Sequence, residues 1–178
     1  MNVALTPAQL ALRDEIRSYM DAIMTPELLA ELLGEQREGG GPQHRKALQQ
    51  MGSDGWIVRS WPREYGGQDA GPIEQYIFCD EVIRAGFPYP FLTTDGVGPV
   101  LAAVASDEIR ESVVSPILRG ECVIAIGYSE PAAGTDLASL TTRAERKGDK
   151  WVINGQKIWT SYGNVADYVW LAARTDPH

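Results

Sequence analysis

The pattern of apolar residues changes once along the chain, after Gly120, and this change limits the possible fold more than any other feature of the sequence. Before Gly120, apolar residues recur at helical spacing between breaks made of proline and glycine. After it come short runs rich in β-branched and aromatic residues, and the first, residues 122–126, is too short for a typical buried helix. The sequence therefore predicts an α+β fold. An all-α helical domain is expected over residues 1–119, and the first part of an antiparallel β domain over residues 120–178.

Several helices are expected before Gly120. Thr6 is a suitable N-cap for the first, and Pro7 fits its first position, where an amide hydrogen would lack a partner. Asp107 is a suitable N-cap for the last. The expected helical segments are residues 7–23, 26–33, 44–51, 72–85, 97–105 and 107–118, and the glycine- and aromatic-rich residues 52–71 are expected to form an ordered loop.

Four strands are expected after Gly120, at residues 122–126, 141–145, 151–153 and 168–172. The pairs Gly148-Asp149 and Asn154-Gly155 have the composition of tight turns. An antiparallel sheet that stopped at residue 178 would have an open edge and an uncovered face. We therefore expect the chain to be a fragment, or a second polypeptide to complete the β domain.

The composition argues against several classes of protein. Of the 178 residues, 44% are hydrophobic and 22% are charged, which is typical of a globular protein. The net charge of −8 argues against nucleic-acid binding, because phosphate recognition requires clustered Lys and Arg. No segment resembles a signal peptide or approaches the roughly 18 apolar residues of a membrane span. We expect a cytoplasmic protein that binds neither membrane nor nucleic acid.

The sequence gives no sign of a metal site or of a common catalytic motif. Cys79 and Cys122 lie far apart in apolar settings, and together with His44 and His178 they show no zinc-type spacing. Neither Gly-x-Gly-x-x-Gly nor Gly-Lys-Ser/Thr is present, and no Gly-x-Ser-x-Gly elbow appears. We expect no metal and no Ser-His-Asp triad.

The segment at residues 127–136 is the first candidate site. It is a long turn directly after the first expected strand. Gly134 would let the backbone approach a ligand, and Thr135 offers a hydroxyl donor for an anionic oxygen. A simple β-turn with local hydrogen bonds explains the same residues, and composition favours that interpretation.

The segment at residues 154–161 is the second candidate site. Its Trp159 stands next to two hydroxyl side chains. A tryptophan is usually part of a core, but its ring can also form a wall for a planar cofactor. Periodicity does not decide between these interpretations.

Four landmarks stand in order along the chain. They are Trp-Pro-Arg-Glu-Tyr-Gly-Gly at 61–67, Tyr-Ser-Glu-Pro-Ala-Ala-Gly-Thr-Asp at 128–136, Asn-Gly-Gln-Lys-Ile-Trp-Thr-Ser at 154–161, and Ala-Asp-Tyr at 166–168 ahead of Ala-Arg-Thr-Asp at 173–176. With these landmarks the chain resembles the acyl-CoA dehydrogenase flavoprotein family, and the match runs essentially from end to end. The order and spacing of the landmarks are more specific than any one of them.

The resemblance implies an all-α N-terminal domain, an antiparallel β-barrel middle domain that is incomplete here, and a helical C-terminal domain that is missing. It implies FAD as cofactor and oxidation of an acyl-CoA thioester to the α,β-enoyl form. In that reaction a carboxylate removes the Cα proton while the Cβ hydrogen leaves as hydride to flavin N5. The glutamate base of the family lies beyond His178, so no catalytic residue is assigned to this chain. Glu130 belongs to the framework of the loop.

The resemblance also implies which residues hold the flavin. Thr135 has a second implied role, near the bound thioester substrate. The implied cofactor-binding residues are Ile126, Tyr128 and Ser129 beside the ring, Gly134 and Thr135 near the flavin phosphates, and Trp159, Thr160 and Ser161 on the other side of the ring.

The chain departs from the family pattern at four positions. Ala132 stands where glycine is common, and Ser129 and Ser161 replace threonines while keeping the hydroxyl. Tyr162 replaces a frequent asparagine, which leaves the local turn open.

Residues 126–131 and 159–161 are similar to those of actinobacterial dehydrogenases that act on steroid side-chain CoA thioesters and assemble from unlike subunits. The implied partners are an acyl-CoA substrate, an electron-transfer flavoprotein or similar acceptor, and further subunits in a homo- or hetero-oligomer. Three alternatives stay open. They are an acyl-CoA oxidase or flavin monooxygenase of the same fold, a non-catalytic companion subunit, and a helical binding module whose β tail is incidental.

Overall fold

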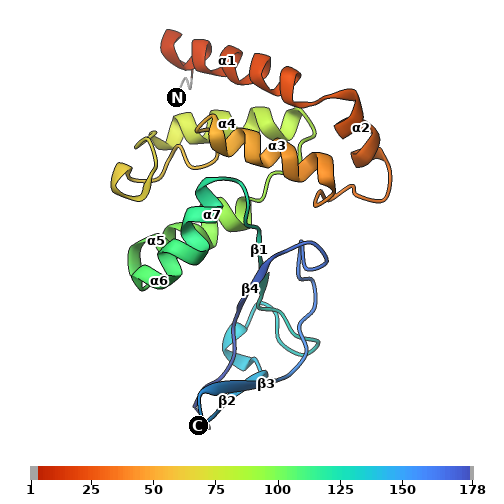
Figure 1. Cartoon of the computed structure of the whole chain (residues 1–178), viewed down its shortest axis with the longest axis vertical. Coiled ribbons are helices and arrows are strands. Elements are labelled where there is room, and N and C mark those ends of the chain that lie inside the picture. Colours follow the sequence, from red (N-terminus) through yellow and green to blue (C-terminus); the bar gives the residue numbers. More distant parts are fainter. Residues whose placement is uncertain (1–3, 177–178) are drawn as a thin grey trace. The chain divides into compact units, whose positions relative to one another are not determined.

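The computed structural model describes residues 4–176. The chain forms two compact units, Met1–Cys122 and Val123–His178. The described part of the first unit is helical, and the second consists of short strands joined by long loops (Figure 1). This arrangement confirms the α+β class expected from the sequence.

The helices of the first unit begin where the sequence offers caps. Thr6 caps α1 through a reciprocal pair of hydrogen bonds with Gln9, and the hydroxyl of Thr25 accepts from the Leu28 amide to cap α2. Four helices have proline at their first position. The helices are α1 Pro7–Ile23, α2 Pro26–Leu33, α3 Pro42–Ser53, α4 Pro72–Arg84, α5 Gly98–Val104, α6 Asp107–Ile109 and α7 Ser115–Leu118, with a short 3-10 turn at Arg63–Tyr65.

The expected start of the third helix and the expected N-cap of the last are wrong. Helix α3 begins at Pro42 rather than His44, because the Glu31 carboxylate accepts from the amides of Gln43 and His44 at 2.9 and 2.8 Å and so stabilises an earlier start. Asp107 is not an N-cap. The side chain of Ser106 accepts from the Ile109 amide at 3.4 Å instead.

The segment expected to be helical from residue 97 begins earlier and is less regular. Leu92–Val97 and Arg110–Val114 are π-helical, and each runs directly into an α-helix. Thr93 and Thr94 are buried in the first of these segments. Helical periodicity in the sequence does not reveal either π-helical segment, because such turns are rare departures from the regular α-helix.

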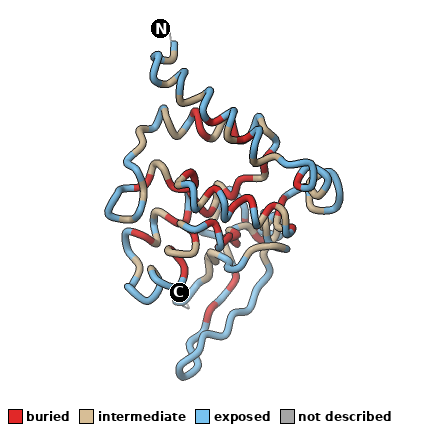
Figure 2. Tube along the Cα trace, turned by 45° about the horizontal axis from the view of Figure 1, so that its top comes forward, coloured by how far each residue is buried: buried red, intermediate tan, exposed pale blue. Residues whose placement is uncertain are grey.

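The core of the first unit lies between α1, α3 and α4. Buried and exposed positions alternate along the helices (Figure 2), as expected for amphipathic elements. An aromatic cluster extends this core, with Phe78 between Trp56 and Tyr89 at ring-centroid distances of 6.0 and 5.3 Å. The guanidinium of Arg17 on α1 donates to the Glu81 carboxylate on α4 at 2.7 and 2.9 Å, which joins these two helices by a bidentate ion pair.

The Trp61–Gly67 landmark contributes to this core. Trp61 is buried, and its indole N–H donates to the Thr94 carbonyl at 2.6 Å. Gly66, at φ +87°, ends the 3-10 turn that follows. A Cβ at Gly67 would collide with the Trp61 carbonyl, so this landmark is a closely packed corner of the backbone.

Helix α3 carries a buried histidine whose protonation is coupled to folding. Nδ1 of His44 accepts from the Gly40 amide at 2.9 Å, so Nε2 is the protonated nitrogen and donates to the Pro88 carbonyl at 2.8 Å. Burial is the main cause that lowers the pKa of His44 from its ordinary value of 6.5, and the charge of Arg45 acts in the same direction. The ring is therefore held neutral at neutral pH.

We expect the first unit to lose stability as the pH falls through 6.5 and below. The unfolded chain binds the His44 proton at a higher pH than the folded chain, so the free energy of unfolding is greatest above the unfolded pKa. Urea unfolding followed by helical circular dichroism at about pH 7.5 and about pH 5.5 measures the loss. In His44→Gln the difference between the two pH values should shrink. An equal difference in both proteins would assign the loss to other groups.

The second unit contains two separate pairs of strands. Strand β2 Arg143–Lys147 and strand β3 Lys150–Asn154 form an antiparallel hairpin, closed by Gly148 at φ +67° and Asp149. The tight turn expected there is confirmed. The expected turn at Asn154-Gly155 is wrong, because β3 ends at Asn154 and, within residues 4–176, no strand returns beside it. Gly155 instead lies against Thr142, where a Cβ would overlap the threonine side chain.

The other strand pair is parallel rather than antiparallel. Strand β1 Ile124–Gly127 pairs with β4 Tyr168–Leu171, with Ile124 opposite Tyr168 and Gly127 opposite Leu171. A parallel pair requires a long crossover, which residues 128–167 supply. The crossover contains both candidate site segments except Gly127, which ends β1. No helix within residues 4–176 is long and apolar enough to cross a membrane.

Candidate cofactor site

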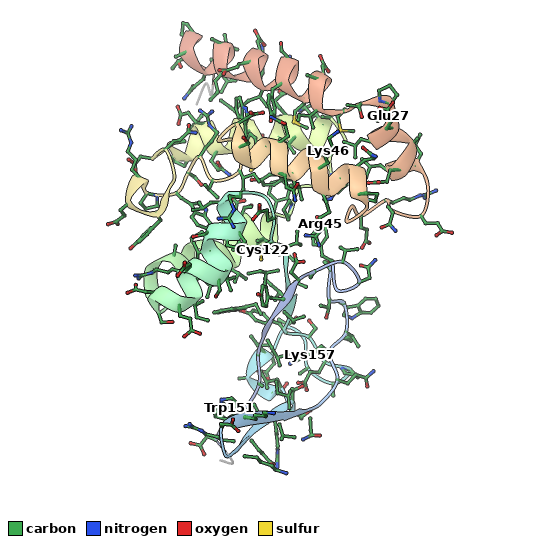
Figure 3. The ribbon with its side chains drawn as sticks, viewed as in Figure 1. Glu27, Arg45, Lys46, Cys122, Trp151 and Lys157 are labelled. Carbon is green, nitrogen blue, oxygen red and sulfur yellow. The ribbon has the colours of Figure 1, made fainter. Side chains whose placement is uncertain are left out.

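The structure brings the two candidate segments together. The Ile158 amide donates to the Ser129 carbonyl at 2.9 Å, and the Lys157 ammonium donates to the Tyr128 carbonyl at 2.9 Å. Lys157 lies within the second unit, among the loops of the crossover (Figure 3). Residues 127–136 and 154–161, which are separate motifs in the sequence, therefore form one surface.

A buried carboxylate lies behind this surface. Glu130 accepts from the Thr141 amide and hydroxyl at 2.6 and 2.7 Å, from the Thr142 amide at 2.8 Å, and from Lys157 at 2.9 Å. Hydrogen bonds from Thr142, Lys157 and Thr141 hold the pKa of Glu130 well below its ordinary range, although burial acts in the opposite direction. A carboxylate held in this way is a poor proton acceptor, which agrees with a framework role.

Trp159 is not part of a core. Its side chain is 86% exposed, and its backbone adopts φ +58°, which is uncommon for a bulky residue. The turn is closed by hydrogen bonds from the Ser161 amide to the Trp159 carbonyl and from the Gly163 amide to the Thr160 carbonyl, both at 3.0 Å. Large exposed rings in strained backbone are characteristic of binding surfaces. Within the residues that the structure describes, this exposure argues against the core interpretation, and the wall interpretation stays a prediction.

Tyr162, three positions after Trp159, has the same left-handed backbone. Tyr162, at φ +62°, occupies the position where the family often has asparagine, which tolerates this conformation well. Its carbonyl accepts from the amides of Val165 and Ala166 at 2.9 and 2.8 Å. The backbone at Tyr162 therefore forms a turn closed by hydrogen bonds.

Ile126 and Tyr128 lie on and just after strand β1. Ile126 is opposite Trp170 of β4 in the register, and the Trp170 indole N–H donates to the Tyr128 hydroxyl at 3.0 Å. Tyr128 is partly exposed, and Ile126 and Ser129 are half-buried. Trp170 was not a predicted site residue, since the sequence placed it only in a strand.

Gly134 and Thr135 follow a tight turn. The backbone groups of Glu130 and Ala133 bond to each other, with the Glu130 amide donating at 2.7 Å and the Ala133 amide at 3.2 Å. The β-turn interpretation of this segment is therefore correct for residues 130–133, and Ala132 fits there on an exposed corner. Gly134 and Thr135 lie beyond the turn and are exposed, and a Cβ at Gly134 would meet nothing within 4 Å.

The surface formed by the two segments carries an exposed ring, hydroxyl donors and an unobstructed glycine. An exposed aromatic face, exposed hydroxyls and an open glycine loop suit a planar ring system with an attached diphosphate.

Among the residues that the structure describes, no group of three or more His, Cys, Asp or Glu side chains could hold a metal ion. A cavity of about 310 Å³ between α1, α2 and α3 is lined by Glu27, Leu28, Lys46 and Ala47, among others, and by none of the predicted site residues.

Sequence reasoning missed the residues that support the site. Lys157, Thr141 and Thr142 all bind the Glu130 carboxylate, but Lys157 and Glu130 are 27 positions apart. Only a strand register or a three-dimensional structure could have paired them. A lysine is ordinarily exposed to solvent, so the residue type of Lys157 did not indicate a buried ion pair.

Family models match both units of the chain. The model described as acyl-CoA dehydrogenase, N-terminal domain, matches residues 6–121, and the model described as acyl-CoA dehydrogenase, middle domain, matches residues 125–178. The chain belongs to the acyl-CoA dehydrogenase family. The resemblance drawn from the four landmarks is thereby confirmed.

Relatives within this family match almost the whole chain. Acyl-CoA dehydrogenase FadE26 of Mycobacterium tuberculosis is 49% identical over 178 residues, which cover 99% of this chain and 44% of FadE26. The crystal structure of the ChsE4-ChsE5 complex from Mycobacterium tuberculosis matches with a TM-score of 0.88 and 48% identity, over 99% of this chain and 45% of that chain. A structure described as the Tcur3481-Tcur3483 steroid ACAD matches with a TM-score of 0.89 and 49% identity, over 100% and 46%. The chain spans less than half the length of these relatives.

Proposed function

We propose that this chain supplies a flavin-binding surface to an FAD-dependent acyl-CoA dehydrogenase. The observation that carries the proposal is the exposed Trp159, held beside the 127–136 loop by the bond from Ile158 to Ser129. Packing within the described residues does not explain a large exposed ring next to hydroxyls and an open glycine loop, whereas contact with a ligand would. Membership of the acyl-CoA dehydrogenase family gives this surface a matching cofactor.

The proposal distributes the predicted residues around the cofactor. Thr135 also has a role toward the thioester substrate. Ile126, Tyr128 and Ser129 would lie beside the ring, Trp159, Thr160 and Ser161 on its other side, and Gly134 and Thr135 near the phosphates. The open space around Gly134 supports the last assignment, since nothing within 4 Å would obstruct a ligand at that point.

The bound FAD would accept a hydride from Cβ of the acyl-CoA, while a carboxylate supplied from outside this chain takes the Cα proton. Glu130 is not that carboxylate, because its oxygens are occupied by threonine and lysine donors. The residues of this chain bind and orient the ring, and the backbone turns at Trp159 and Tyr162 hold the ring wall in place.

The substrate class and the assembly are further parts of the proposal. The similarity at residues 126–131 and 159–161 favours a steroid side-chain CoA thioester, and one related structure is described as a steroid ACAD. Two related structures contain two differently named chains, which supports a hetero-oligomer. An electron-transfer flavoprotein or similar acceptor would reoxidise the flavin.

The absorption spectrum of the protein, purified with its natural subunits and without added cofactor, tests this function. We expect a flavin band in the blue that bleaches when a steroid side-chain acyl-CoA is added without oxygen. A colourless protein that also fails to bind added FAD would contradict the proposal and favour a companion subunit. A rapid burst of peroxide in air would favour an acyl-CoA oxidase.

A further inference from the structure

The ion pair between Lys157 and Glu130 is almost completely enclosed. The exposed fractions of the two side chains are 11% and 3%, and the Nζ to Oε1 distance is 2.9 Å. Removing two charges from water costs about as much free energy as their attraction returns, so a buried pair of this kind contributes little net stability. The pair is therefore considered for the segments that its contacts hold together and not for its contribution to stability.

The lysine has a second acceptor on the candidate flavin loop. Its Nζ donates to the Tyr128 carbonyl at 2.9 Å. Peptide bonds are trans throughout the described residues, so the amide of Ser129 points away from the carbonyl that Lys157 holds. Lys157 thus fixes the orientation of the peptide between Tyr128 and Ser129.

The carboxylate extends the same contact to a third segment. Glu130 binds Thr141 and Thr142, which precede β2, and Thr142 lies against Gly155 at the start of the Trp159 segment. Residues 127–136, 141–142 and 154–161 therefore meet at one carboxylate. Moving either charged side chain would weaken the link between the loop and the segment that carries the tryptophan, and would leave the bond from the Ile158 amide to the Ser129 carbonyl.

We propose that Lys157 and Glu130 are positioning residues for the flavin, which hold the Tyr128–Ser129 peptide and the Trp159 segment in the geometry that the ring requires. This inference rests on the proposed function. Neither residue touches the ring. They act through the backbone groups that they orient, and the threonines fix the carboxylate in turn.

The test compares Lys157→Gln and Glu130→Gln with a matched control, Lys150→Gln, which changes an exposed lysine of the same unit. In the FAD-bound protein, both test variants are expected to raise the dissociation constant of FAD by about tenfold or more and to shift the visible band of the bound flavin. Hydrogen exchange at residues 127–136 should become faster. Lys157→Arg keeps the charge and should recover most of the affinity, while the control should match the unmodified protein.

The readouts separate this inference from the proposed function. If the unmodified protein binds FAD and Lys157→Gln has the same affinity, spectrum and hydrogen exchange, the positioning role is wrong and the function stands. If the unmodified protein binds no FAD, the proposed function is wrong, and unchanged exchange in Lys157→Gln then overturns the positioning role as well. If either single variant does not fold, the double variant Lys157→Met with Glu130→Gln, which leaves no unpaired charge, is tested in its place.

Discussion

Replacing Trp159 by alanine is expected to weaken FAD binding by about tenfold or more and to leave the free energy of unfolding within about 0.5 kcal/mol of the unmodified protein. The reason is exposure. With 86% of its side chain in contact with solvent, Trp159 has little packing to lose. The ring of a bound flavin would cover it, so the truncation removes contact area only in the complex. Titration of apoprotein with FAD and urea unfolding give the two numbers.

Trp151→Ala is the matched control for this experiment. Trp151 is also in the second unit, on strand β3, and is 52% exposed, but it is not among the predicted site residues (Figure 3). FAD affinity should be unchanged in this variant. Equal affinity in the unmodified protein and Trp159→Ala would remove Trp159 from the site, and equal losses in both variants would indicate a general disturbance of the second unit.

Much of the fold could be predicted from the sequence because its signals are local. The capping residues Thr6 and Thr25, the prolines that open helices, and the turn at Gly148 each act within a few positions of their own place in the chain. The parallel pairing of β1 with β4 could not be predicted in this way. It depends on a crossover of some forty positions whose path is set by packing, and the composition of two short strands does not reveal their relative direction.

The sequence predicted the segments of the candidate site but not the residues that support them, again because its signals are local. The family landmarks located Trp159 and the 127–136 loop, but periodicity carries no information in irregular segments, so the core and wall interpretations stayed open. The exposure of Trp159 argues against the core interpretation, and its contact with a cofactor stays a prediction. The supporting ion pair of Lys157 and Glu130 has no local signature, and it became visible only when the structure brought distant segments together.

Trp61→Ala should have the opposite consequence to Trp159→Ala. Trp61 is 2% exposed, its N–H is bonded to the Thr94 carbonyl at 2.6 Å, and its ring lies so close to Gly98 that a Cβ there would approach it to 2.5 Å. Truncation leaves a cavity and an unpaired carbonyl in the π-helical segment, which together should lower the free energy of unfolding of the first unit by about 3–5 kcal/mol. Urea unfolding followed by helical circular dichroism measures this loss, because the α-helices all belong to the first unit within residues 4–176.

The same control, Trp151→Ala, decides how the result is interpreted. A half-exposed tryptophan on a hairpin should cost less than about 1 kcal/mol and leave the helical transition in place. If Trp61→Ala also lost less than about 1 kcal/mol, Trp61 would not be packed in the core as the structure has it. If this loss is large and Trp159→Ala loses FAD affinity, then the first landmark of the family is explained by packing and the third by ligand binding. The same residue type would then serve stability at position 61 and cofactor contact at position 159.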